Sequence, residues 1–303
     1  MTPLPSLRQL RYLLALHQHR HFGRAAEACF VTQSSLSAAI QELEQIIGVS
    51  LVERSRRHVL FTPLGEQIVE RTGRILREVE DLVEHAQAGR EPLTGALRLG
   101  VIPTIGPYVL PDLMPRLRRA FPRLQLYLRE DQTAPLIDRL NAGELDLVLL
   151  ALPYETEALE TLDLARDGLV VACPAGHPFA AQDGVSPDQL ADQPLLLLED
   201  GHCLRHHALE LCHLTGPGRN EVFQGTSLRT LVQMAAAGVG ITLVPKIAET
   251  IELRNVPGLV FRDLVTTAPS RTIALAWRRT SARRAEFQQL GQLIAAGLPP
   301  LTP

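Results

Sequence analysis

The chain has 303 residues, 46% of them hydrophobic, which suggests about two or three domains with cores of their own. No apolar run reaches the roughly 18 residues of a membrane helix, and no apolar stretch follows the first charges as in a secretory signal. We therefore expect a cytoplasmic protein with no membrane partner. Residues 1–62 hold seven arginines and four glutamates, a charge of +3, so the net charge of −3 leaves −6 for the rest. This asymmetry favours a polyanionic partner at the N-terminal part alone.

The first 62 residues are predicted to form three helices and a β-hairpin. Leucines at helical spacing mark the first helix, at Leu7, Leu10, Leu13 and Leu14. A second helix covers residues 22–29, and Thr32 is suited to cap a third helix that Gly48 ends. The hairpin covers residues 51–61, with Arg54, Arg56 and Arg57 near its tip. Two helices joined by a tight turn and followed by a basic hairpin are typical of a winged helix-turn-helix domain.

A long helix is predicted to follow, over residues 63–90. Thr62 and Pro63 provide a capping hydroxyl and a proline at the first helical position. Apolar and small side chains then alternate in steps of four and three, at Ile68, Thr72, Ile75, Val79, Leu82 and Ala86. This is a coiled-coil seam, which indicates pairing with a second copy of the chain; the alternative is packing against the chain's own body.

Residues 91–303 alternate short apolar strands with helical patterns, which is typical of α/β lobes built on parallel sheets. We expect two Rossmann-like lobes, lobe I over about 96–165 and 270–303 and lobe II over about 166–269. The late strand at 271–277 would then return to the first lobe. Ligands in such folds bind in the cleft at the carboxyl ends of the strands.

Three stretches resemble the LysR-type transcriptional regulators: residues 22–29 (FGRAAEAC), 33–37 (QSSLS) and 51–54 (LVER). The resemblance implies a winged helix-turn-helix domain at 1–62, a dimerising linker helix at 63–90 and a two-lobed, periplasmic-binding-protein-like regulatory domain at 91–303. It also implies a double-stranded DNA operator, RNA polymerase as a partner, and assembly into homodimers and homotetramers.

Within that family the chain is most similar to the members that sense hydrogen peroxide. The similarity lies in residues 102–108 (IPTIGPY), 199–205 (EDGHCLR), Cys212, 226–228 (TSL) and 240–245 (GITLVP). It implies that Thr104, Thr133 and His202 hold the peroxide and that Arg271 favours the Cys203 thiolate. Relatives typically carry an acidic residue where this chain has His206, a difference that bears on thiol acidity.

Cys203 and Cys212 form the predicted redox pair. Cys203 follows Asp200 and Gly201 at a helix start, where the helix dipole favours a thiolate, and His202 and Arg205 add positive charge. Oxidation to a sulfenic acid would let Cys212 close a disulfide. On one helix the nine residue steps from Cys203 to Cys212 span roughly 13 Å, whereas a disulfide needs Cα atoms about 4.4–6.8 Å apart. Oxidation therefore requires the helix to refold. Cys29 and Cys173 are expected in apolar cores.

The DNA contacts are predicted at the start of the third helix and on the hairpin. Gln33 can pair with adenine through two hydrogen bonds, and short polar neighbours allow close approach to base edges. Ser34 departs from the family, where proline is common. The expected base-reading residues are Thr32, Gln33, Ser34, Ser35 and Ser37, and the expected phosphate contacts are Arg8, Arg54 and Arg57.

Three other functions are alternatives to peroxide sensing. A small organic effector could bind Thr104, Thr133 and Ser227 in the same cleft, with the cysteines incidental. A metal could bind the histidines and cysteines of residues 202–213, in which His202 and His206, or Cys203 and His207, are four apart. An enzyme is disfavoured, since the sequence has no phosphate-binding glycine loop, nucleophile elbow or paired catalytic carboxylates. We expect no cofactor.

Overall fold

The computed structural model describes residues 3–54, 59–88, 92–156, 159–211, 221–265 and 271–299. Arg56, Arg57 and Cys212 lie outside the described residues, so predictions about them are untested. The chain divides into two compact units, Met1–Arg90 and Glu91–Pro303, with separate hydrophobic cores. Within the described ranges, no helix is both long and apolar enough to cross a membrane.

The first unit begins with three helices, α1 (Leu7–His19), α2 (Phe22–Ala28) and α3 (Gln33–Ile47). Ser6 caps α1 in a capping box with Gln9, and Gly48 ends α3 at φ +83°, where a residue without Cβ is favoured. The helices bury one core, with the side chains of Leu13, Leu16, Ala25, Leu36, Ile40 and Leu43 almost fully enclosed. The three predicted helices are confirmed.

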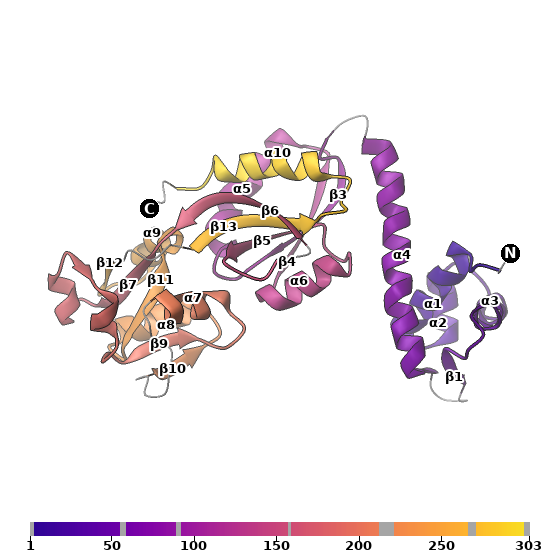
Figure 1. Cartoon of the computed structure of the whole chain (residues 1–303), viewed down its shortest axis with the longest axis horizontal. Coiled ribbons are helices and arrows are strands. Elements are labelled where there is room, and N and C mark those ends of the chain that lie inside the picture. The colour runs from indigo at the N-terminus through magenta and orange to yellow at the C-terminus, as the bar shows by residue number, and fades with distance from the viewer. Residues whose placement is uncertain are drawn as a thin grey trace. The chain divides into compact units, whose positions relative to one another are not determined.

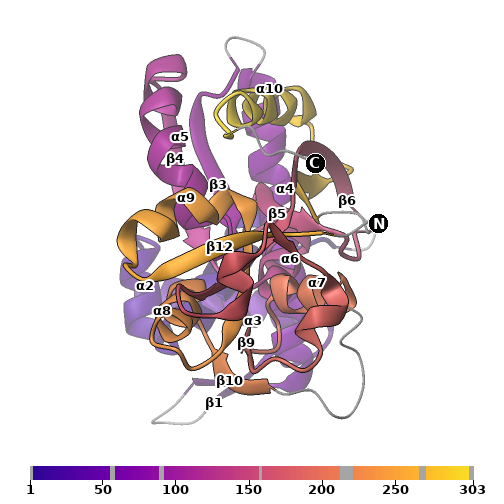
Figure 2. The same cartoon turned by 90° about the vertical axis from the view of Figure 1, so that its left-hand side faces the viewer.

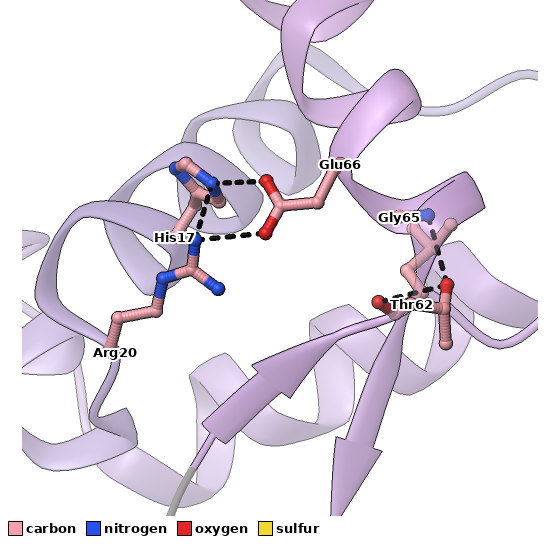
Figure 3. Close-up of polar contacts among 6 residues, drawn as sticks. His17, Arg20, Thr62, Gly65 and Glu66 are labelled. Atoms are coloured by element: carbon pink, nitrogen blue, oxygen red, sulfur yellow. Dashed lines mark hydrogen bonds and ion pairs between the residues drawn. The ribbon is translucent and has the colours of Figure 1, made fainter.

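The hairpin and the long helix meet at a close contact. Strands β1 (Val52–Arg54) and β2 (Val59–Phe61) pair antiparallel, and α4 (Pro63–Ala88) follows. Thr62 Oγ1 accepts a hydrogen bond from Gly65 N at 2.9 Å and donates to Ser50 O at 3.1 Å (Figure 3). A Cβ at Gly65 would lie 2.2 Å from Leu51 O, so only glycine permits this approach.

The predicted seam on α4 is divided between two environments. Thr72 is buried, together with Val69 and Leu76, against the core of the first unit. Ile75 and Leu82 are 47% and 67% exposed. The expected six-residue stripe is therefore wrong at Thr72, because this part of α4 packs on its own domain. The exposed apolar side chains remain available to a second copy.

The first sheet of the second unit has five strands in the order β4-β3-β5-β13-β6 (Figure 1). Its strands are β3 (Gly95–Val101), β4 (Leu124–Glu130), β5 (Leu147–Leu152), β6 (Leu159–Asp167) and β13 (Arg271–Arg278). Helices α5 (Gly106–Ala120) and α10 (Arg284–Ala295) cover one face, and α6 (Thr133–Asn141) covers the other. The late strand does return to this sheet, where it lies between β5 and β6.

The second sheet has six strands in the order β10-β9-β11-β7-β12-β8. They are β7 (Leu169–Pro174), β8 (Gly184–Val185), β9 (Leu195–Leu198), β10 (Glu221–Gly225), β11 (Ile241–Pro245) and β12 (Leu259–Leu264). The helices of this lobe are α7 (Cys203–Leu211), α8 (Leu228–Ala236) and α9 (Lys246–Asn255), with short 3-10 turns at Pro178–Ala181 and Pro187–Leu190.

Both sheets contain the expected parallel strand pairs, and each also contains antiparallel ones. β13 runs antiparallel to β5 and β6, and β7 runs antiparallel to β11 and β12. β6 ends at Asp167 and β7 begins at Leu169, so the chain passes almost directly from the first sheet to the second. The two lobes also touch at their helices, since Tyr108 on α5 donates to Glu252 on α9 at 3.0 Å, where Figure 2 shows α9 beside α5.

Candidate functional site

Polar side chains from four strand ends gather at one edge of the first sheet. β3, β4 and β5 are parallel, and β6 runs in the same direction because both it and β5 are antiparallel to β13. Their carboxyl ends, and the start of β13, therefore share an edge. Thr104, Thr133, Asp167 and Arg271 lie there, all at most 3% exposed.

Arg271 is the centre of this edge. Its Nη2 and Nε donate to Asp167 Oδ2 at 2.6 and 2.9 Å, and its Nη1 donates to Thr104 Oγ1 at 3.1 Å. Asp167 Oδ1 also accepts from Ile247 N of the second lobe at 2.9 Å. The guanidinium charge is thus neutralised by a fully buried carboxylate, and the same group fixes the Thr104 hydroxyl.

The second lobe contributes α7, which begins at Cys203. The Cys203 side chain is buried, at 7% exposure, and its neighbour in the first lobe is Tyr154, whose pKa is raised by burial and by the nearby Cys203. Gly201 precedes the helix at φ +95°, and Gln132 donates to Asp200 O at 3.4 Å from the first lobe. The amino end of α7 therefore lies against the strand ends of the first sheet.

Arg205 and His202 do not present free positive charge. Arg205 is buried, donates to Leu198 O at 3.0 Å and forms an ion pair with Asp200 at 2.9 Å. Burial lowers the pKa of His202 below its ordinary value, and Glu199 opposes this only in part. The charged form of His202 is disfavoured, contrary to the expectation that it adds positive charge near the thiol.

Two buried polar atoms at this junction have no hydrogen-bond partner in the described part of the chain: Thr133 Oγ1 and His207 Nδ1. Thr133 is the first residue of α6, and His207 lies one turn after Cys203 on α7. His207 Nε2 is 2.9 Å from Pro153 O, and burial lowers the pKa of the ring, with Arg271 contributing. From the sequence, His207 is expected only as a metal ligand, because it lies four positions after Cys203.

The predicted metal cluster is not assembled by the described residues. His202 precedes α7 and is buried, whereas the His206 side chain is 76% exposed and lies 3.6 Å from Glu210. No group of three or more His, Cys, Asp or Glu side chains within the described ranges could hold a metal ion.

The two remaining described cysteines are less suited to react with an oxidant. Cys173 is fully buried on β7, and Cys29 is partly buried at the end of α2. Burial raises the pKa of both thiols, which lowers the thiolate fraction near neutral pH.

The start of α3 presents a small polar surface. Thr32 Oγ1 accepts from Ser35 N at 3.2 Å and shares hydrogen bonds with the hydroxyls of Ser34 at 3.0 Å and Ser35 at 2.8 Å. Gln33 and Arg8 are exposed, and Ser37 is partly exposed. The serine at position 34 thus adds a hydroxyl to the cap. Among the predicted phosphate contacts, Arg57 lies outside the described residues and the Arg54 side chain is not described.

Gln33 provides a test of base reading. We expect Gln33→Ala to lose most of the preference for the operator over random DNA, by about 1–3 kcal/mol, while weak salt-sensitive binding persists. Gel-shift titrations on both DNAs measure the ratio. Gln45→Ala, at an exposed glutamine near the other end of α3, is the matched control; equal operator preference in the two variants would remove Gln33 from the interface.

The hairpin, α1 and α4 are joined by a charged cluster (Figure 3). Glu66 on α4 contacts His17 at 2.7 Å and Arg20 at 2.9 Å, and the Arg20 guanidinium lies 4.9 Å from the centroid of the Phe61 ring. Together with the Thr62 cap, these contacts hold the first turn of α4 to the helix-turn-helix. Glu66 is 49 positions from His17 and 46 from Arg20, so local sequence patterns do not reveal this cluster.

Comparison with known protein families gives two matches. Residues 7–66 match the bacterial regulatory helix-turn-helix protein, lysR family, and residues 90–299 match the LysR substrate binding domain. The DNA-binding transcriptional dual regulator OxyR of Escherichia coli K12 is 44% identical over 96% of this chain and 95% of its own. The HTH-type transcriptional regulator EstR of Acinetobacter baylyi is 43% identical over 97% of each.

Solved structures that resemble this chain are also OxyR proteins. A full-length OxyR variant from Pseudomonas aeruginosa superposes with a TM-score of 0.79 at 36% identity, covering 99% of this chain and 100% of its own. A hydrogen-peroxide-bound OxyR mutant from Corynebacterium glutamicum has a TM-score of 0.66 at 35% identity, covering 98% and 94%.

Proposed function

The chain belongs to the LysR family of bacterial helix-turn-helix regulators, and on this basis we propose that it is a cytoplasmic DNA-binding regulator switched by hydrogen peroxide. The switch is oxidation of Cys203 followed by a disulfide with Cys212. One observation carries the proposal: Cys203 is buried at the amino end of α7, against the polar edge of the first sheet. A helix start favours a thiolate, which is the form that reacts with peroxide.

The peroxide would be held by Thr104, Thr133 and His202. The Thr133 hydroxyl supports this role, because it is buried with its oxygen unpaired among the described residues, and peroxide both donates and accepts hydrogen bonds. Arg271 fixes the Thr104 hydroxyl and so shapes the same site. Peroxide reduction by this site is stoichiometric signalling and not enzymatic turnover.

The disulfide requires α7 to shorten. The described helix spans eight steps from Cys203 to Leu211, which places their Cα atoms about 12 Å apart. A disulfide needs Cα atoms roughly 4.4–6.8 Å apart, so Cys203 could bond to the cysteine that follows Leu211 in the sequence only if the end of α7 unwinds. Oxidation would thus couple chemistry to a change of fold.

The proposed partners are a double-stranded operator, RNA polymerase and further copies of the chain, as homodimers and homotetramers. The exposed Ile75, Leu82 and Val83 on α4 support self-association through this helix, since an apolar stripe on a long helix is unfavourable in water.

Mass mapping of the reduced protein before and after mild peroxide tests the proposal. We expect one new crosslink, between the peptides that contain Cys203 and Cys212, with Cys29 and Cys173 still reduced. Circular dichroism should show a small helix loss in the same sample. Oxidation of all four cysteines at similar rates, or of Cys203 without any crosslink, would contradict the switch.

A small organic effector is the second candidate. The Thr133 hydroxyl, which has no partner among the described residues, would also suit a carboxylate. Ser227 is less available, since its hydroxyl caps α8 by accepting from Thr230 N at 3.1 Å. A Cys203→Ser protein that still responds in cells would favour the effector.

A further inference from the structure

Glu66 lies in the first turn of α4, and residues of α1 and its end hold both oxygens of its carboxylate (Figure 3). His17 Nε2 lies 2.7 Å from Oε2, and Arg20 Nη2 donates to Oε1 at 2.9 Å. Burial raises the pKa of this carboxyl, but the hydrogen bonds from Arg20 and His17 outweigh burial, so the pKa lies below its ordinary value. Glu66 is therefore ionised at neutral pH and pairs with the Arg20 guanidinium.

The hairpin joins the same cluster through Phe61. The Phe61 ring packs edge-on against the His17 ring, with centroids 5.0 Å apart, and the Arg20 guanidinium lies 4.9 Å from its centroid. Arg20 has a left-handed backbone conformation, with φ at +47°, where a side chain is strained. Strain of this kind persists where the surrounding structure imposes it. Here the strained residue is the one whose side chain joins α1 to both α4 and β2.

The cluster contributes orientation to α4 and little stability. The side chains of Glu66 and Arg20 are 46% and 43% exposed, and ion pairs this exposed add little to folding. A buried stripe of Val69, Thr72 and Leu76 holds α4 to the core of the first unit. Apolar packing is non-directional, so the stripe attaches the helix without fixing its angle. The hydrogen bonds of Glu66 are directional and can fix it.

The position of Glu66 around the helix suits this role. At 3.6 residues per turn, Glu66 lies about 90° around α4 from the centre of the buried stripe, and the exposed Ile75 and Leu82 lie about 100° away on the other side. A helix that rests on a narrow stripe can rock toward either side. The contacts of Glu66 restrain α4 on the side opposite to Ile75 and Leu82, so they oppose this rocking.

A small change of angle has a large effect because α4 is long. Leu82 is 16 residues beyond Glu66, or about 24 Å along the axis, so a change of about 10° displaces it by about 4 Å. Successive base pairs of DNA are about 3.4 Å apart. When two copies pair through Ile75 and Leu82, the angle of α4 therefore decides how far apart their two α3 helices meet the DNA.

We propose that Glu66 is a positioning residue for operator recognition, which sets the separation of the two half-sites that a dimer reads. This inference rests on the proposed function, in which copies of the chain associate through α4 and bind double-stranded DNA. Glu66 acts through the angle of α4 and not through a contact with DNA. Its loss should therefore change the selectivity for half-site separation and leave the affinity for one half-site unchanged.

The test compares full-length reduced wild type, Glu66→Ala and Glu70→Ala. Glu70 is four residues further along α4, is 62% exposed and pairs with Arg74 on the same helix, so its variant loses the same charge outside the cluster. Selection from a pool of randomised duplexes with wild type identifies the half-site and its preferred separation. Gel-shift titrations then use duplexes whose half-site separation changes by single base pairs, and a duplex with one half-site.

Wild type and Glu70→Ala should prefer the best separation over its neighbours by about tenfold, because one base pair shifts and rotates a half-site. In Glu66→Ala we expect a preference of about threefold or less, because α4 then takes a range of angles. Its thermal midpoint and its affinity for one half-site should match wild type. Arg20→Ala should give the same flat profile, and the double variant no flatter one, because both residues act through one contact.

A Glu66→Ala protein with the wild-type preference overturns the inference, and so does an equal loss of preference in Glu70→Ala, which would assign the effect to charge alone. If alanine lowers the thermal midpoint, Glu66→Met is measured by the same criteria, since methionine keeps the length and helix propensity without an acceptor oxygen. A wild type that selects only single half-sites contradicts the proposed assembly together with this inference, whereas the first two outcomes contradict the inference alone.

Discussion

Replacing Arg271 with methionine is expected to destabilise the second unit by about 3–5 kcal/mol. The side chains of Arg271 and Asp167 are 1% and 0% exposed, so the variant leaves a buried carboxylate whose only remaining bond in the described chain is to Ile247 N. The loss should appear as a lower urea midpoint. The chain has one tryptophan, Trp277, which is buried on the same strand, so its fluorescence follows this unit alone.

The double variant Arg271→Met with Asp167→Asn is the control for this explanation. It removes the orphaned charge and retains a polar group at position 167. We expect it to regain a substantial part of the lost stability, since most of the penalty comes from the unpaired charge. If the free energy of unfolding of Arg271→Met were within about 1 kcal/mol of the wild-type value, the Arg271–Asp167 pair would not be as desolvated as it is in the structure.

Replacing Cys203 with serine is expected to abolish the response to peroxide completely. Serine is close to cysteine in size and tolerates a helix start, so folding and DNA binding in the absence of peroxide should be unchanged. The measured quantity is the difference in operator affinity between reduced and peroxide-treated protein. It should fall to zero, because the side chain at 203 can no longer be oxidised by peroxide.

Cys29→Ser is the matched control for that experiment. This thiol lies in the helix-turn-helix, and its raised pKa makes it a poor nucleophile. The variant should retain the full peroxide-dependent change in affinity. If Cys29→Ser abolished the response and Cys203→Ser retained it, the sensing cysteine would be Cys29 in the first unit. That result would contradict the proposal.

The sequence predicted the elements whose periodicity is local and strong. The stripe from Leu7 to Leu14 and the Thr32 cap appear where expected. β6 is hard to recognise from sequence because it is an edge strand of alternating charged and apolar residues, LETLDLARD, that packs one face only. The direction of β13 was also missed, since strand polarity depends on long-range pairing that local pattern does not contain.

Positions next to strand ends predict that Thr104, Thr133 and Arg271 lie at the same edge of the first sheet, and Arg271 contacts Thr104 there. The charges around these residues could not be predicted in the same way. Asp167 was not predicted as the partner of Arg271, because the two residues are 104 positions apart in the sequence. Asp200 was not predicted as the partner of Arg205, because it was expected only to mark the start of a helix. The spacing of the histidines did not predict how they are oriented on α7. His206 is exposed to solvent, whereas His207 is buried.

The pairing of Asp167 with Arg271 in adjacent strands has a consequence for the whole second unit. The chain leaves the first sheet at Asp167, the end of β6, and re-enters it at the paired residue Arg271, the start of β13. The entire second lobe is therefore an insertion between two neighbouring antiparallel strands. Two neighbouring backbone strands are its only covalent tether. Any swing of that lobe pivots at a point beside Thr104, and small rotations there displace α7 relative to the sheet edge it faces.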